Sequence, residues 1–149
     1  MDTTFLESAR EEILAEAWDG AAASSRYATA GGGEVGRRLE VLFDALVDAG
    51  RTNDVHAIVE YARTVARVRF AAGYGLGDVQ VAVNALEEAT WKCVLAQVPP
   101  EEAAEALRVV STVLGLAKDA LAQEYVRLAC EARAPAVDVA ALAGGAAAG

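Results

Sequence analysis

The chain has 149 residues and a formal net charge of −9 at neutral pH, and 54% of its residues are apolar, many of them alanine. This length suits one domain with a single sizeable core. The negative charge argues against binding of nucleic acid and against docking on an anionic membrane, because both depend on basic surfaces. The abundance of alanine favours closely packed helices, since alanine has the highest helix propensity.

The sequence contains no recognisable targeting or membrane-spanning segment. The first residues, Met1 to Thr4, carry no basic group, unlike the start of a signal peptide. No apolar run approaches the roughly 20 residues that are needed to cross a bilayer. Cys93 and Cys130 lie outside any CxxC pair and do not form a disulfide framework, so we interpret them as small apolar side chains. These features predict a soluble protein of the reducing cytoplasm.

Apolar spacing predicts five helices, of which the first two precede and follow a glycine-rich connection. The first begins near Thr4, where Thr4 and Glu7 have the spacing of a reciprocal capping box, and it fades by about residue 25. From about residue 25 to the triple glycine at residues 31–33, the sequence predicts a flexible connection. The second helix is expected over residues 35–49, with Gly50 as its C-terminal stop.

The third and fourth predicted helices are joined by the glycine-rich segment GYGLGD at residues 73–78. The third helix is expected to begin after a cap at Thr52 or Asn53 and to end with Gly73 as its C-cap. Asp78 is expected to cap the fourth helix, which extends to about residue 98. Glycine-rich phosphate-binding loops follow a strand, whereas this segment joins two helices, so we interpret it as a tight turn.

The fifth predicted helix begins at the Pro99–Pro100 pair, extends to about residue 132 and carries two apolar stripes. The first stripe comprises Leu107, Val110, Leu114, Ala117, Leu121 and Leu128, and the second comprises Val109, Val113, Leu116, Ala120 and Val126. One stripe can face the core, and the other then needs a partner, for which a second copy of the chain is the simplest candidate. Which stripe faces outward is left open. The candidate homodimer interface comprises Val109, Val113, Leu116 and Ala120, with Gly115 admitting a close neighbour.

The remaining residues divide into one domain and a tail. Residues 1–133 are predicted to form the helical domain, and residues 134–149, which are rich in alanine and glycine, a flexible tail.

No group of side chains forms a recognisable catalytic, metal or cofactor site. His56 is the only histidine, and it shares a polar stripe with Glu60, Arg63 and Arg67, which favours a solvated side chain over a haem ligand. A single histidine cannot supply the two Glu-x-x-His motifs of a di-iron bundle. Acidic pairs such as Glu87–Glu88 are interpreted as solvated, or as partners of Arg63 or Arg67. We therefore expect no enzyme activity and no cofactor.

The middle of the chain resembles a known family. An arginine-bearing helix around residues 61–70, a Gly-x-x-Leu turn from Gly73 to Leu76 and a helix with Trp91 near its end resemble the N-terminal domain of RsbR-type stressosome proteins. The resemblance implies a non-haem, globin-like bundle whose last two long helices are antiparallel and form the dimer. It also implies a sensor or regulatory module that contacts other proteins of a stressosome-like pathway. Without the resemblance, a helical domain that binds haem or an apolar small molecule stays an alternative.

Overall fold

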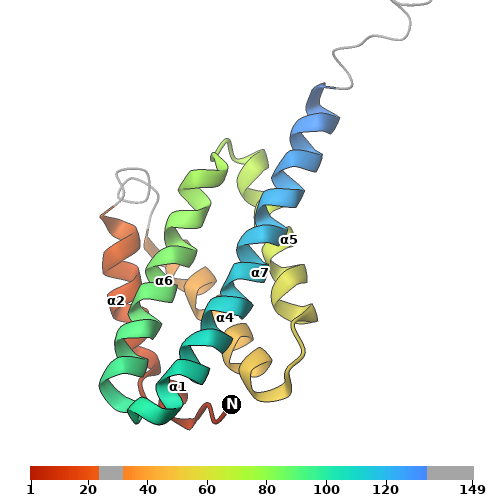
Figure 1. Cartoon of the computed structure of the whole chain (residues 1–149). Coiled ribbons are helices and arrows are strands. Elements are labelled where there is room, and N and C mark those ends of the chain that lie inside the picture. Colours follow the sequence, from red (N-terminus) through yellow and green to blue (C-terminus); the bar gives the residue numbers. More distant parts are fainter. Residues whose placement is uncertain (24–31, 134–149) are drawn as a thin grey trace, which may run out of the picture.

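The computed structural model describes residues 1–23 and 32–133, and this part of the chain forms six helices. They are α1 (Thr4–Ser8), α2 (Arg10–Ala22), α4 (Gly32–Thr52), α5 (His56–Ala71), α6 (Leu76–Gln97) and α7 (Pro100–Arg133) (Figure 1). The prediction of an all-helical chain is confirmed. The first predicted helix is divided at Ala9 into α1 and α2. The predicted tail, residues 134–149, and most of the predicted flexible connection lie outside the described residues.

The start of α1 corrects the predicted capping box. Thr4 is the first residue of the helix, and its backbone N–H and its hydroxyl both donate to the carboxylate of Asp2, at 2.9 and 2.7 Å. Thr3 is the N-cap residue, and the carboxylate of Asp2, one residue before it, accepts from the first turn, where the positive end of the helix dipole stabilises its charge.

The predicted stop at Gly50 is also wrong. Helix α4 continues through Gly50 to Thr52, and Asn53 ends it with a positive φ of 60°. A Cβ at Gly50 would lie 2.8 Å from the Cε atom of Met1, and the terminal amino group of Met1 donates to the carbonyl of Gly50 at 3.2 Å. Glycine at this position therefore lets the Met1 side chain pack closely against α4. The predicted cap of α5 at Thr52 or Asn53 is likewise wrong, since Asp54 accepts from the backbone N–H of His56.

In the turn between α5 and α6, the glycine takes its predicted place at the end of α5, whereas the predicted cap of α6 lies elsewhere. Gly73 has a φ of +84°, and the N–H of Tyr74 donates to the carbonyl of Arg69, so Gly73 ends the helix as predicted. Asp78 lies inside α6 rather than before it, and its carboxylate accepts from the N–H of Gly75 at 2.9 Å. The helix begins at Leu76, and the Asp78 carboxylate satisfies the backbone N–H of Gly75, the N-cap residue.

The core is built around α7. This helix has 34 residues, about 50 Å at 1.5 Å per residue, and it packs against both α5 and α6. Figure 1 shows its C-terminal turns extending past the turn between α5 and α6. Helix α2 packs on α6, where a Cβ at Gly20 would lie 3.2 Å from that of Ala85. Each helix of the described part contributes at least one of the largest fully buried side chains. These are Leu6, Ile13, Val35, Leu39, Phe43, Leu46, Ile58, Leu86, Val94, Val110, Leu114 and Leu121.

Candidate functional site

The residues predicted to form a dimer interface on α7 do not share one exposed face. Val113 and Ala120 are each 4% exposed and belong to the core. Val109 is half-buried against that core, and Leu116 is 37% exposed. Part of the second stripe is internal because α5 and α6 both pack against α7, so the buried sector of this helix is wider than a single stripe. Val113 and Ala120 are therefore corrected from interface residues to core residues.

A different exposed surface lies where α6 and α7 meet, and we call it the α6–α7 face. It comprises Trp91 and Leu95 on α6, which are 40% and 67% exposed, with Ser111 and Gly115 on α7. The indole Nε1 of Trp91 donates to the hydroxyl of Ser111 at 3.2 Å. Gly115 lies one turn from Ser111 on the same side of α7, and a Cβ added there would meet nothing within 4 Å. Large apolar side chains thus border a strip of small ones.

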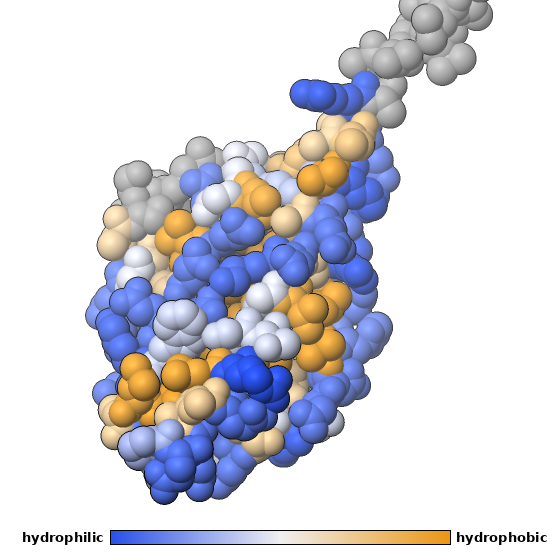
Figure 2. All heavy atoms as spheres, viewed as in Figure 1, coloured by the Kyte–Doolittle hydropathy of each residue, from blue (hydrophilic) through white to orange (hydrophobic). Residues whose placement is uncertain are grey.

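Paired charges surround the α6–α7 face. Lys118 donates to Glu87 at 2.5 Å, Lys92 binds Glu16 and Glu88 at 2.6 and 3.2 Å, and Arg108 binds Glu105. Figure 2 shows apolar patches and blue charged groups interspersed over α6 and α7. The prediction that Glu87 or Glu88 pairs with Arg63 or Arg67 is wrong, because α7 supplies the partners: Lys118 for Glu87, and Glu124 for Arg67.

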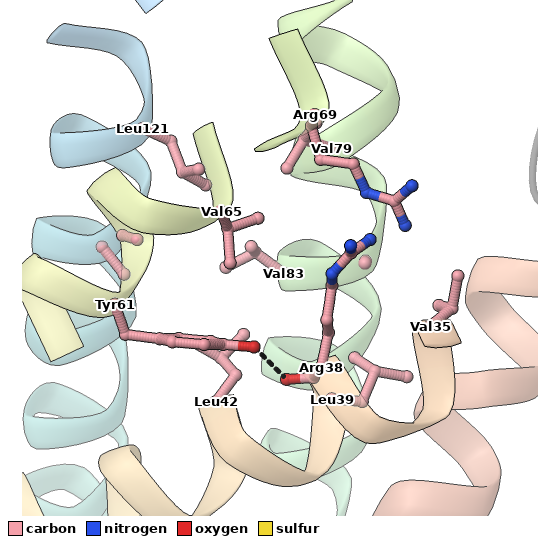
Figure 3. A pocket seen from close by; sticks show the side chains of 13 residues that line it. Val35, Arg38, Leu39, Leu42, Tyr61, Val65, Arg69, Val79, Val83 and Leu121 are labelled. Carbon is pink, nitrogen blue, oxygen red and sulfur yellow. Dashed lines mark hydrogen bonds between the residues drawn. The ribbon is translucent and has the colours of Figure 1, made fainter. Parts of the chain in front are cut away.

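A small cavity of about 40 Å³ lies among α4, α5, α6 and α7 (Figure 3). Most of the side chains that line it are apolar, and three of them, Ala62, Ala82 and Ala117, are short enough to leave the space open. The lining residues are Val35, Arg38, Leu39, Leu42, Tyr61, Ala62, Val65, Arg69, Val79, Ala82, Val83, Ala117 and Leu121.

Two arginines and a tyrosine are the polar side chains of this cavity. Figure 3 shows the guanidinium groups of Arg38 and Arg69 on the same side, facing one another from α4 and α5. The Tyr61 hydroxyl donates to the backbone carbonyl of Arg38 at 3.3 Å. Burial raises the pKa of Tyr61, and the positive charges of Arg38 and Arg69 oppose that increase.

The two guanidinium groups are held differently. Arg69 is only 5% exposed, and its guanidinium lies over the ring of Tyr74, 4.5 Å from the centroid. Arg38 donates through Nη2 to Glu34 at 2.5 Å. Its Nη1 atom is buried, and no group of the described residues accepts a hydrogen bond from it. A buried charged donor without an acceptor is costly, which makes this atom a candidate ligand-binding group.

Sequence reasoning missed Arg69, although its position carried a signal. Arg69 follows Ile58, Ala62 and Val65 at the spacing of the buried face of α5, so an arginine takes an apolar position. Glu124 likewise follows Ala117 and Leu121 on the first stripe of α7. A charged residue on an apolar stripe indicates a buried polar contact.

The residues that the sequence analysis considered as possible ligands or reactive groups do not lie together in one site. His56 is exposed at the first residue of α5 and does not line the cavity. Cys93 is half-buried, and burial, followed by the charge of Glu12, raises the pKa of its thiol. Among residues 1–23 and 32–133, no three His, Cys, Asp or Glu side chains are grouped so that they could hold a metal ion. Within the same ranges, no helix has both the length and the apolar character of a membrane span.

Comparison with known proteins gave no match: no protein-family model, curated protein or solved structure is significantly similar to this chain.

Proposed function

We propose that this chain is a non-enzymatic regulatory module of bacterial stress signalling that acts through protein–protein contacts as a homodimer. The observation that carries the proposal is the α6–α7 face, where Trp91 and Leu95 are exposed beside the open strip at Ser111 and Gly115. Aromatic anchors within a polar rim are typical of protein interfaces. The resemblance to the N-terminal domain of RsbR-type proteins supplies the pathway, including contacts with other stressosome-like proteins.

The proposal includes a globin-like bundle in which the two long helices are antiparallel. Lys118 pairs with Glu87, and Ser111, earlier on α7, pairs with Trp91, later on α6. In these two pairs the residue number rises along α6 while it falls along α7, which supports an antiparallel arrangement of the two helices. Two copies of such a pair can pack as a four-helix arrangement with two-fold symmetry.

The shape of the α6–α7 face favours a second copy as the occupant. A two-fold axis brings each part of a surface against another part of the same surface. Here the large side chains of Trp91 and Leu95 on one copy would lie on the small residues Ser111 and Gly115 of the other. A glycine in mid-helix costs roughly 1 kcal/mol relative to alanine. No neighbour within the described part of the chain requires Gly115 to be glycine, whereas a close partner helix would.

The oligomeric state tests the proposal. We expect light scattering during gel filtration to give a dimer for the wild type, and a monomer for Leu95→Glu, because the added carboxylate would be buried between copies. Val41→Glu is the matched control. Val41 is also an exposed apolar residue, but it lies on α4, so this variant is expected to stay dimeric.

A wild type that is a well-folded monomer at tens of micromolar would contradict the dimer. So would a Leu95→Glu variant that stays as dimeric as Val41→Glu.

A further inference from the structure

We propose that the cavity among α4, α5, α6 and α7 binds a small monocarboxylic acid with a short apolar tail, whose carboxylate lies between Arg38 and Arg69. This site goes beyond the proposed function, since it does not involve the α6–α7 face.

The unpaired donor of Arg38 indicates that the ligand carries a carboxylate. The Nη2 atom of Arg38 already binds Glu34, while its Nη1 atom is buried and has no acceptor in the described part of the chain. The adjacent guanidinium of Arg69 is almost fully buried and is fixed over Tyr74 (Figure 3). Burial weakens solvent screening, so an anion that accepts a hydrogen bond from Nη1 of Arg38 is favoured beside these guanidinium groups. A planar carboxylate matches the geometry of a guanidinium group.

The apolar side chains that line the rest of the cavity indicate that the ligand has a short apolar tail. Valine, leucine and alanine side chains form the wall away from the arginines, and the Tyr61 hydroxyl is engaged with the Arg38 carbonyl. No other polar side chain lines the space, so it does not provide the additional donors that a phosphate group needs. The volume of about 40 Å³ is far too small for haem, so any ligand of this cavity is small.

The site can be tested by isothermal titration calorimetry of the full chain with sodium hexanoate, butanoate and acetate, and with hexan-1-ol. We expect hexanoate to bind at least tenfold more tightly than acetate, because each buried methylene strengthens binding by roughly fourfold. We also expect it to bind at least tenfold more tightly than hexan-1-ol, which has the same tail and no charge.

Two variants test the assignment of residues. Arg38→Gln is expected to weaken hexanoate binding at least tenfold, whereas Arg37→Gln, which removes an exposed arginine from the next position of α4, is expected to leave it unchanged. Ala82→Leu fills the cavity and keeps both arginines, so it is expected to abolish hexanoate binding. This second variant tests the site even where Arg38→Gln does not fold, and melting curves verify the fold of each variant.

Three results would overturn the proposal: no binding of hexanoate or butanoate, equal binding of hexanoate and hexan-1-ol, or equal binding to the Arg38→Gln and Arg37→Gln variants. Repeating the titration with Leu95→Glu separates this inference from the proposed dimer. We expect the cavity to bind hexanoate equally in that variant.

Discussion

Arg67 on α5 donates to the carboxylate of Glu124 on α7 across 2.9 Å, although 57 residues separate them in the chain. Arg127 donates to the same carboxylate from one turn farther along α7, at 2.5 and 3.0 Å. Glu124 is only 6% exposed, so its charge depends on these two partners. The three side chains therefore join α5 to α7 in the half of the bundle that is distant from the N-terminus of α7.

The Glu124 contact predicts a loss of stability in acid. Hydrogen bonds from Arg127, and then from Arg67, lower the pKa of Glu124 from 4.5 to about 2, against the effect of burial. A lowered pKa in the folded state means that the stabilisation is complete above the ordinary value and is lost as the pH falls toward about 2. We expect the free energy of unfolding from urea titrations to decrease over this window. In Glu124→Gln the decrease should be smaller, and a wild type and variant with parallel pH profiles would contradict this assignment.

The position of α7 between its neighbours predicts a large cost for Leu114→Ala. Leu114 is fully buried, and its truncation leaves a cavity that neighbouring helices cannot close. We expect a loss of about 3 kcal/mol in the free energy of unfolding, measured by urea denaturation. Val41→Ala truncates an exposed apolar side chain on α4, away from the α6–α7 face, and serves as the control, with an expected change below about 1 kcal/mol. Similar losses in the two variants would argue against this arrangement of α7.

Gly115 and Gly36 form a matched pair that tests the dimer by a second route. Both lie within helices, and a Cβ at either position meets nothing within 4 Å. Alanine should therefore stabilise the isolated chain at both positions, by about 0.5–1 kcal/mol. Only Gly115→Ala is expected to weaken the dimer, since Gly115 lies on the α6–α7 face. Sedimentation equilibrium measures the dissociation constants, and equal constants for the two variants would remove Gly115 from the interface.

The exposed position of His56 predicts that the chain does not bind haem stoichiometrically. The side chain lies at the start of α5 and takes no part in the cavity. We expect no Soret band in the purified protein and no saturable complex after addition of haem. A stable one-to-one complex that His56→Ala abolishes would contradict this prediction.

The sequence by itself determined where several helices end. Gly73 ends α5 because its positive φ suits glycine, and Pro100 begins α7 because proline is tolerated in the first turn. The periodic apolar residues also predicted an all-helical chain correctly, since spacing sets which side chains share a face of one helix. Each of these features depends on residues that are neighbours in the chain.

Only the tertiary structure decided what each face contacts. Val113 and Ala120 are buried because α7 has helices on both sides, and Gly50 lies inside α4, with Met1 packed against it. Arg38 and Arg69 lie on different helices, so their approach depends on how α4 and α5 pack around the cavity. Helical spacing fixes directions around one helix axis, whereas burial and pairing depend on which other helices occupy those directions.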